Sequence, residues 1–356
     1  MNSLQLHRQL MQHFAMIGLK ATPHQRANLA LLCQTLAFSP NCHLAMLALG
    51  LPLPGRRENL IQHLRRTLKN QQLRSAECYQ PLVRYLFAHW PDTEIDLVMD
   101  RTDLEDRFSI LTLGAAHHKR LVPLAWQVLD FGSTSAAEQI ALLKRIQPAL
   151  PPVSQVRIHF YGDAEFRPIL LQQTCQDWGW HWQVGLKSDW WWRTPTGTWQ
   201  TLRDLNLQPG QRRYLSQIYL TREHQFGPLN VLADWAVHQD TPRYWALDLP
   251  ADRHAWRRGR KRYWIEPTFR DWKSYGFDLE RSCLTDAHRL EVLLLGIAVT
   301  TVWLMHVGMR LRRTGQADEL DARAQTDYSV FRLGRDYLQR CRTLERTIPV
   351  GFAMLR

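Results

Sequence analysis

The chain has 356 residues, of which 45 are Lys or Arg and 33 are Asp or Glu, so its formal net charge is +12. Apolar residues make up 45% of the sequence, which excludes a disordered chain, and the length predicts two or three domains. The six cysteines form no CxxC pair, which argues against a zinc site or a disulfide framework and favours a reducing, cytoplasmic setting. The charge favours a polyanionic partner.

Residues 1–90 are predicted to form a helical DNA-binding domain. They hold ten Lys or Arg but only Glu58 and Glu77 as acids, a balance of 10 − 2 = +8. Apolar residues recur at helical spacing from Leu60 to Leu68, which leaves Arg65 and Arg66 free to face outward. A small helical bundle with a solvated basic face is the alternative, and the charge density favours contact with nucleic acid.

Residues 91–187 are predicted to form the first part of an α/β core. Expected strands at 94–100, 108–115, 121–129, 156–160 and 182–186 alternate with expected helices at 136–150 and 166–176. The resulting order, β-β-β-α-β-α-β, is typical of an RNase H-like fold. Asp100 and Asp163 are expected at the ends of its first and fourth strands.

The remaining sequence is predicted to form three segments. Residues 188–250 are expected to be a β-rich insertion, with strands that include 231–237. Residues 251–310 should complete the core, and 292–305 is too short an uncharged run for a membrane span, so a buried core helix is expected. Residues 311–356 are expected to be a helical C-terminal tail.

One predicted helix in the 251–310 segment carries an acid among cations. Glu266, Arg270 and Lys273 are spaced i, i+4 and i+7, which places them on one helix face, and Arg262 lies one turn upstream. A salt-bridge cluster is the simpler interpretation. If Glu266 meets Asp100 and Asp163, however, three carboxylates would form a site for Mg²⁺, or Mn²⁺ in its place. Such ions support phosphoryl displacement, and the flanking cations would bind DNA phosphates.

These residues resemble the signature of DDE transposases of bacterial insertion sequences, in the branch called insertion sequence family four with its Y-R-E-K motif. Arg262 precedes Glu266 by four positions and Lys273 follows it by seven, as in that motif, whereas Gly259 stands where the motif has Tyr. The stretches 100–104 and 161–166 resemble the two aspartate motifs of the family.

The resemblance implies a metal-dependent enzyme that binds the transposon ends and catalyses cut-and-paste transposition. Asp100, Asp163 and Glu266 would be catalytic and metal-binding residues, and the partners would be double-stranded end and target DNA, bound by a homodimer near the bacterial nucleoid and away from membranes. A Trp in the insertion would stack on a flipped base. Trp245 is the best candidate, and Trp191 and Trp235 are competitors. The predicted DNA-binding residues are Arg262, Arg270, Lys273, Trp245, Arg258, Lys261, Arg65 and Arg66.

Two other functions fit parts of this pattern. A domesticated transposase acting as a repressor would bind DNA without cutting it, and the presence of all three carboxylates argues against that function. An RNase H-like nuclease would cut without strand transfer. The Arg and Lys residues around Glu266 and the long insertion favour the transposase.

Overall fold

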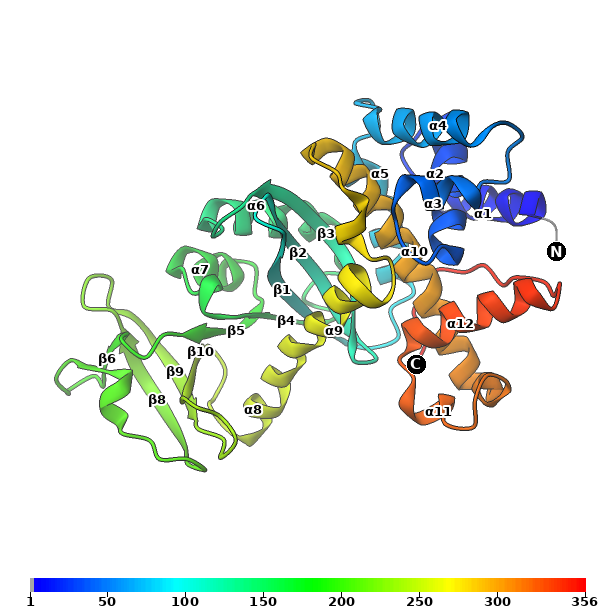
Figure 1. Ribbon diagram of the computed structural model, residues 1–356. Coiled ribbons are helices and arrows are strands. Elements are labelled where there is room, and N and C mark those ends of the chain that lie inside the picture. Colours follow the sequence, from blue (N-terminus) through cyan, green and yellow to red (C-terminus); the bar gives the residue numbers. More distant parts are fainter. Residues whose placement is uncertain (1–2) are drawn as a thin grey trace.

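The computed structural model describes residues 3–356 and shows a mixed α/β protein with one long sheet and a helical region at one end of it (Figure 1). The N-terminal region is entirely helical, as its apolar spacing predicts. Its helices are α1 (Ser3–Ile17), α2 (Pro23–Phe38), α3 (Leu44–Leu49), α4 (Arg57–Lys69) and α5 (Ser75–Ala88). Thr22 caps the N-terminus of α2 in a capping box with Gln25, and Pro23 is the first residue of the helix.

Ten strands form a single sheet in the order β3-β2-β1-β4-β5-β10-β9-β8-β6-β7. The strands of the core are β1 (Glu94–Leu104), β2 (Phe108–His117), β3 (Arg120–Asp130), β4 (Arg157–Gly162) and β5 (His181–Leu186). The first three form an antiparallel meander, and β4 and β5 run parallel to β1. This arrangement is the RNase H-like core that the order of predicted elements indicates.

The insertion continues the core sheet, because β10 pairs antiparallel with β5. Its strands are β6 (Trp191–Arg193), β7 (Gln200–Thr201), β8 (Arg212–Leu220), β9 (Phe226–Asp234) and β10 (Arg243–Leu247). The strand predicted at 231–237 is therefore wrong in its bounds. It begins at Phe226, directly after the turn that joins it to β8, and ends at Asp234.

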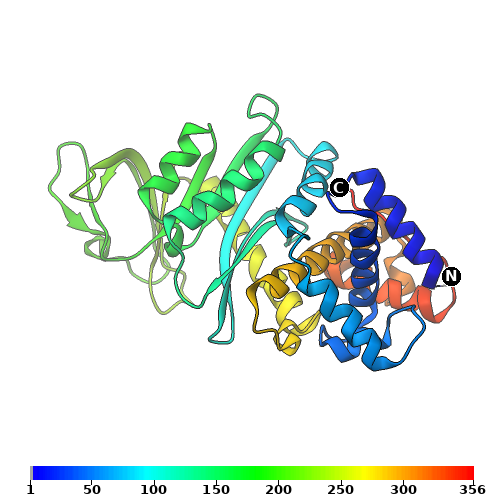
Figure 2. The same cartoon turned by 90° about the horizontal axis from the view of Figure 1, so that it is seen from above.

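Helices cover both faces of the core sheet (Figure 2). Those on one face are α6 (Ala136–Ile146) and α7 (Ile169–Asp177), and the other face carries α8 (Arg253–Gly259), the 3₁₀ segment η4 (Arg260–Trp264) and α9 (Ile265–Arg270). The helical C-terminal part contains α10 (Ala287–Thr314), α11 (Ala324–Asp327) and α12 (Val330–Thr343). The boundary expected at 310/311 lies inside α10.

Helix α10 is a core helix, although it is long and apolar enough to cross a membrane. Of its most apolar stretch, 94% is buried inside the protein, against α2, α12 and β3. Gly308 of α10 and Gly334 of α12 allow the two helices to cross closely. A Cβ at Gly308 would lie 1.8 Å from the carbonyl oxygen of Val330, and a Cβ at Gly334 would lie 1.9 Å from that of Leu304. The helical N- and C-terminal regions are thus packed around one central helix.

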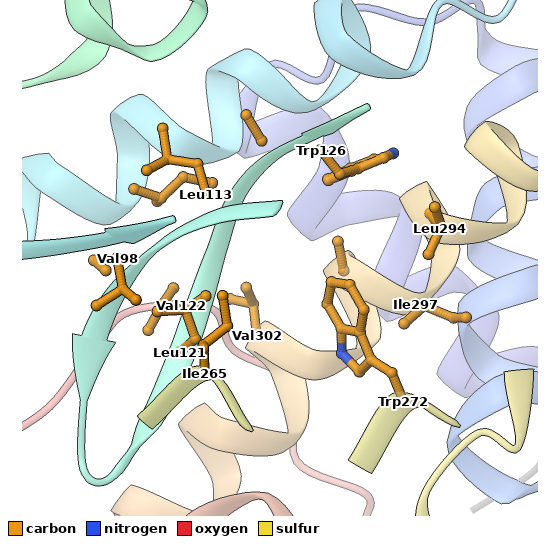
Figure 3. Close-up of a cluster of buried hydrophobic side chains, with 14 of the residues drawn as sticks. Val98, Leu113, Leu121, Val122, Trp126, Ile265, Trp272, Leu294, Ile297 and Val302 are labelled. Atoms are coloured by element: carbon orange, nitrogen blue, oxygen red, sulfur yellow. The ribbon is translucent and has the colours of Figure 1, made fainter. Parts of the chain in front are cut away.

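A buried apolar layer joins this helical region to the sheet (Figure 3). Val98 and Val122 of the sheet lie on one side of the layer, and Leu294 and Ile297 of α10 lie on the other. Side chains from the segment that carries Glu266 enter the same layer. The Glu266 segment is therefore held against the sheet by the main core of the protein.

Candidate active site

The three acidic residues predicted from the sequence surround one guanidinium group. Nη2 of Arg262 lies 3.6 Å from Oδ2 of Asp100 and 3.7 Å from Oδ2 of Asp163, and Nη1 lies 4.0 Å from Oε1 of Glu266. The acids come from β1, from the residue after β4 and from α9, so three separate elements converge at this point.

The parallel pairing of β1 with β4 brings the two aspartates together. The last paired residues of this ladder are Val98 and Tyr161, and each aspartate is the second residue beyond them. Asp163 follows the end of β4 as expected. Asp100 was expected at the end of its strand, but β1 continues to Leu104 because its pairing with β2 extends further than its pairing with β4.

Glu266 reaches the same point because its neighbours are anchored in the core. Ile265 is fully buried, and Trp272 is 1% exposed and donates its indole N–H to Thr301 over 3.1 Å. Figure 3 shows both side chains pointing into the apolar layer. Glu266 itself faces away from that layer, and its side chain is 54% exposed.

The pKa of Asp100 reflects both its burial and the charges of the other cluster members. Burial raises the pKa of its carboxyl group to about 6, the positive charge of Arg262 opposes this rise, and the negative charges of Asp163 and Glu266 add to it. The Asp100 side chain is 16% exposed, against 37% for Asp163. A cation at the centre of the cluster therefore stabilises the ionised carboxylates.

The donor set suits a divalent cation, although the cation now between the acids is Arg262. Three carboxylates are hard oxygen ligands of the kind that Mg²⁺ and Mn²⁺ prefer. Within residues 3–356, no three His, Cys, Asp or Glu side chains are already close enough to enclose a metal ion. Nε of Arg262 is buried and has no hydrogen-bond partner, so this guanidinium is incompletely satisfied where it lies.

The predicted DNA-binding cations differ in how exposed they are and in whether they already form an ion pair. Arg65, Arg66 and Arg270 are exposed, the first two on the outer face of α4. Arg258 is half-buried in α8, and Lys261 makes an ion pair with the buried carboxylate of Asp96. Exposure leaves Arg65, Arg66 and Arg270 accessible to phosphate, whereas the charge of Lys261 is already matched inside the protein.

The helical segment that carries Glu266 changes its geometry before it reaches Lys273, which the i+7 spacing did not predict. Helix α9 ends at Arg270, and a π-helical turn follows from Asp271 to Tyr275. The wider turn changes the angular step per residue, so the i+7 rule no longer applies. Nζ of Lys273 instead donates to the carbonyl of Asp103 over 2.7 Å and lies 3.2 Å from Oε1 of Glu280.

Trp245 and Glu266 line the same large cleft. The cleft has a volume of about 960 Å³ and lies between the insertion and the α8–η4–α9 segment. Trp245 in β10 is half-buried there. Its two competitors are not among the residues that line the cleft. Arg222 lies 3.5 Å above the Trp191 ring, and Trp235 donates its indole N–H to the carbonyl of Gln239.

Gly259 occupies a position where a side chain has no room without rearrangement. A Cβ there would lie 2.2 Å from Nε2 of Gln183, whose side chain is 6% exposed and lines the cleft. The tyrosine of the motif therefore cannot be accommodated unless Gln183 moves. The contact between Gly259 and Gln183 had no signal in the sequence.

Sequence reasoning also missed a second charged pair beside the aspartates. Nε of Arg101 lies 3.2 Å from Oε2 of Glu165, and both side chains are about one-fifth exposed, at 22% and 21%. Arg101 directly follows Asp100, and Glu165 lies two residues after Asp163. This closeness in the sequence is the signal that could have identified the pair.

The sequence matches a known protein family. Residues 115–303, more than half of the chain, match the family described as transposase DDE domain, and this range includes Asp163 and Glu266. No curated protein matches the sequence. A solved structure that the chain resembles is the piggyBac transposase synaptic complex with hairpin DNA. The identity is 9% and the TM-score 0.46, with 95% of this chain and 78% of that chain covered.

The family match extends from the end of β2 to the middle of α10, so it spans most of the core, the whole insertion and the Glu266 segment. The strand order of the core and the acidic residues around Arg262 agree with it. The chain therefore belongs to the family of transposases with a DDE domain.

Proposed function

We propose that this protein binds the terminal inverted repeats of its own insertion sequence and catalyses cut-and-paste transposition by metal-dependent strand cleavage and strand transfer. The observation that carries the proposal is the convergence of Asp100, Asp163 and Glu266 on one cationic centre, from three elements of the fold. Of the three acids, Glu266 also lines the cleft of about 960 Å³, and a cluster of charged groups with a shifted pKa beside a cleft is typical of a functional site.

Asp100, Asp163 and Glu266 would hold Mg²⁺, or Mn²⁺, in the reaction. When bound, the ions would activate the attacking oxygen and stabilise the leaving oxygen of the phosphodiester. Arg262 would neutralise the acids before the metal binds and would contact the DNA phosphate during the reaction, since both partners are anionic groups that a guanidinium binds well.

DNA is expected to bind along exposed and half-buried cations of the helical domain and of the Glu266 segment. Arg65 and Arg66 on α4 would contact the transposon end at the helical domain, and Arg258, Arg270 and Lys273 would contact phosphates near the acids. Trp245 would stack on a base that leaves the duplex, in the same cleft as Glu266. Two copies of the chain would act together, one on each transposon end.

The test is a set of substitutions that remove one carboxylate without changing side-chain size. Asp100→Asn, Asp163→Asn and Glu266→Gln should each abolish Mg²⁺-dependent nicking of DNA that carries the inverted repeats flanking the gene. Each variant should still bind that DNA, because binding depends on phosphate neutralisation elsewhere. Asp106→Asn is the matched control, since this exposed acid lies in the turn after β1.

The products distinguish the alternatives. A wild-type protein that binds the ends but never cuts them would be a repressor. One that nicks but joins no 3′-end to target DNA would be a nuclease. Retention of nicking by Asp100→Asn would show that this aspartate is not part of the catalytic site.

A further inference from the structure

Each of the two aspartates has one oxygen held by a backbone N–H. Oδ1 of Asp100 accepts from the N–H of Arg101 over 2.8 Å, and Oδ1 of Asp163 accepts from the N–H of Glu165 over 2.8 Å. In both residues the other oxygen, Oδ2, is the one that faces Arg262. The rotation of each carboxylate therefore depends on the backbone position of one following residue.

Those two following residues are bonded to each other. Nε of Arg101 donates to Oε2 of Glu165 over 3.2 Å. The bond lies beyond the β1–β4 ladder, whose last pair is Val98 with Tyr161, so no backbone pairing between these two strands fixes the aspartates relative to one another. The Arg101–Glu165 pair joins the two strands directly at this point, in addition to the bridge that Arg262 makes between the aspartates.

Both members of the pair are also anchored away from the aspartates. Oε1 of Glu165 accepts from the backbone N–H and the hydroxyl of Thr134, over 2.8 and 2.6 Å. Nη1 of Arg101 donates to Asp103 and to Ser109, over 2.6 and 3.2 Å. These contacts use both oxygens of Glu165, with Oε1 bound to Thr134 and Oε2 bound to Arg101.

We propose that Arg101 and Glu165 are a positioning pair that sets the separation and orientation of the Asp100 and Asp163 carboxylates for divalent-cation binding. The proposal rests on the proposed function, because it assumes that these two aspartates hold the metal. Second-layer contacts of this kind orient the ligands of a metal, and their loss lowers metal affinity without removing a ligand.

Glu165→Gln separates positioning from folding. The amide oxygen can still accept from Thr134, so the loop before α6 stays attached, but the NH₂ group would face the Nε–H of Arg101 and break the pair. The control is Glu94→Gln. Glu94 pairs with Arg157 over 2.9 Å at the opposite end of the same two strands, far from the aspartates.

The experiment uses the full-length protein without DNA and Mn²⁺ as the probe, with free Mn²⁺ measured by electron paramagnetic resonance. Glu165→Gln should weaken Mn²⁺ binding about tenfold or more. Its melting temperature in EDTA should match that of Glu94→Gln, which should bind Mn²⁺ like the wild type. Nicking by Glu165→Gln should recover as Mn²⁺ is raised, whereas a purely structural defect would not respond to the metal.

Two further variants make each outcome decisive. Asp100→Asn should lose Mn²⁺ binding. If it binds like the wild type, the proposed metal site is wrong, whereas loss in Asp100→Asn with wild-type affinity in Glu165→Gln overturns only the positioning pair. If Glu165→Gln does not fold, Arg101→Met replaces it. This variant keeps the aliphatic part of the side chain but has no donor for Glu165, and its wild-type affinity would equally overturn the proposal.

Discussion

Replacing Arg262 with Gln tests whether one guanidinium neutralises the whole acidic cluster. Two unit charges about 4 Å apart attract each other by about 4 kcal/mol at the effective dielectric constant of a partly buried site, before solvation is considered. The observed separations from Arg262 to the three carboxylates are 3.6, 3.7 and 4.0 Å. Solvent weakens the attraction of Arg262 to the more exposed acids. We therefore expect Arg262→Gln to lower the free energy of unfolding by about 1–3 kcal/mol.

The loss should depend on pH, and its sign follows from Asp100. The pKa of this group in the folded protein, about 6, is already above its ordinary value of 3.8, and removal of Arg262 takes away the charge that lowers it. The folded variant then binds more protons than the unfolded chain, so its stability decreases as the pH rises. The difference from the wild type should be small near pH 4.5 and largest above pH 8.

Urea unfolding in EDTA at these two pH values measures the effect. Arg270→Gln is the control, because Arg270 is an exposed arginine in the same segment. Adding Asp100→Asn to Arg262→Gln should restore part of the lost stability at pH 8, since one of the unneutralised charges is gone. An equal loss at both pH values, or none, would refute the assignment of Arg262 as the shared counter-ion.

Three further predictions concern other parts of the fold. Trp245→Ala should slow hairpin formation about tenfold, because it removes a stacking interaction of about 1–3 kcal/mol, and should leave the first nick nearly unchanged. Both products can be measured on a sequencing gel, and the control Trp191→Ala should affect neither. Burial lowers the pKa of His117 to about 4. The free energy of unfolding should therefore fall by up to about 3 kcal/mol between pH 6.5 and 4, and urea titrations of His117→Gln should show a smaller fall. Gly308→Ala should lower the melting temperature measured by calorimetry, with a cost of about 1–3 kcal/mol, because its Cβ would overlap the carbonyl of Val330.

The local pattern of the sequence was sufficient for the strands of the core and for the proximity of Arg262 to Glu266. Alternation and apolar runs predicted the strands around Asp100 and Asp163 and the order that makes the core RNase H-like. The four-residue spacing of Arg262 and Glu266 predicted their proximity, which the ion pair at 4.0 Å shows. These features depend on residues that are near one another in the chain, and periodicity describes such residues well.

Only the tertiary structure decided how the acids are held and what surrounds them. Three such features join residues that are far apart in the chain. They are the end of the β1–β4 ladder at Val98, the bond between Arg101 and Glu165, and the packing of Gln183 on Gly259. The π-helical turn that contains Lys273 is equally invisible in the spacing of the motif. Such contacts depend on strand register and on how side chains fill the space between elements, and neither quantity is encoded in local periodicity.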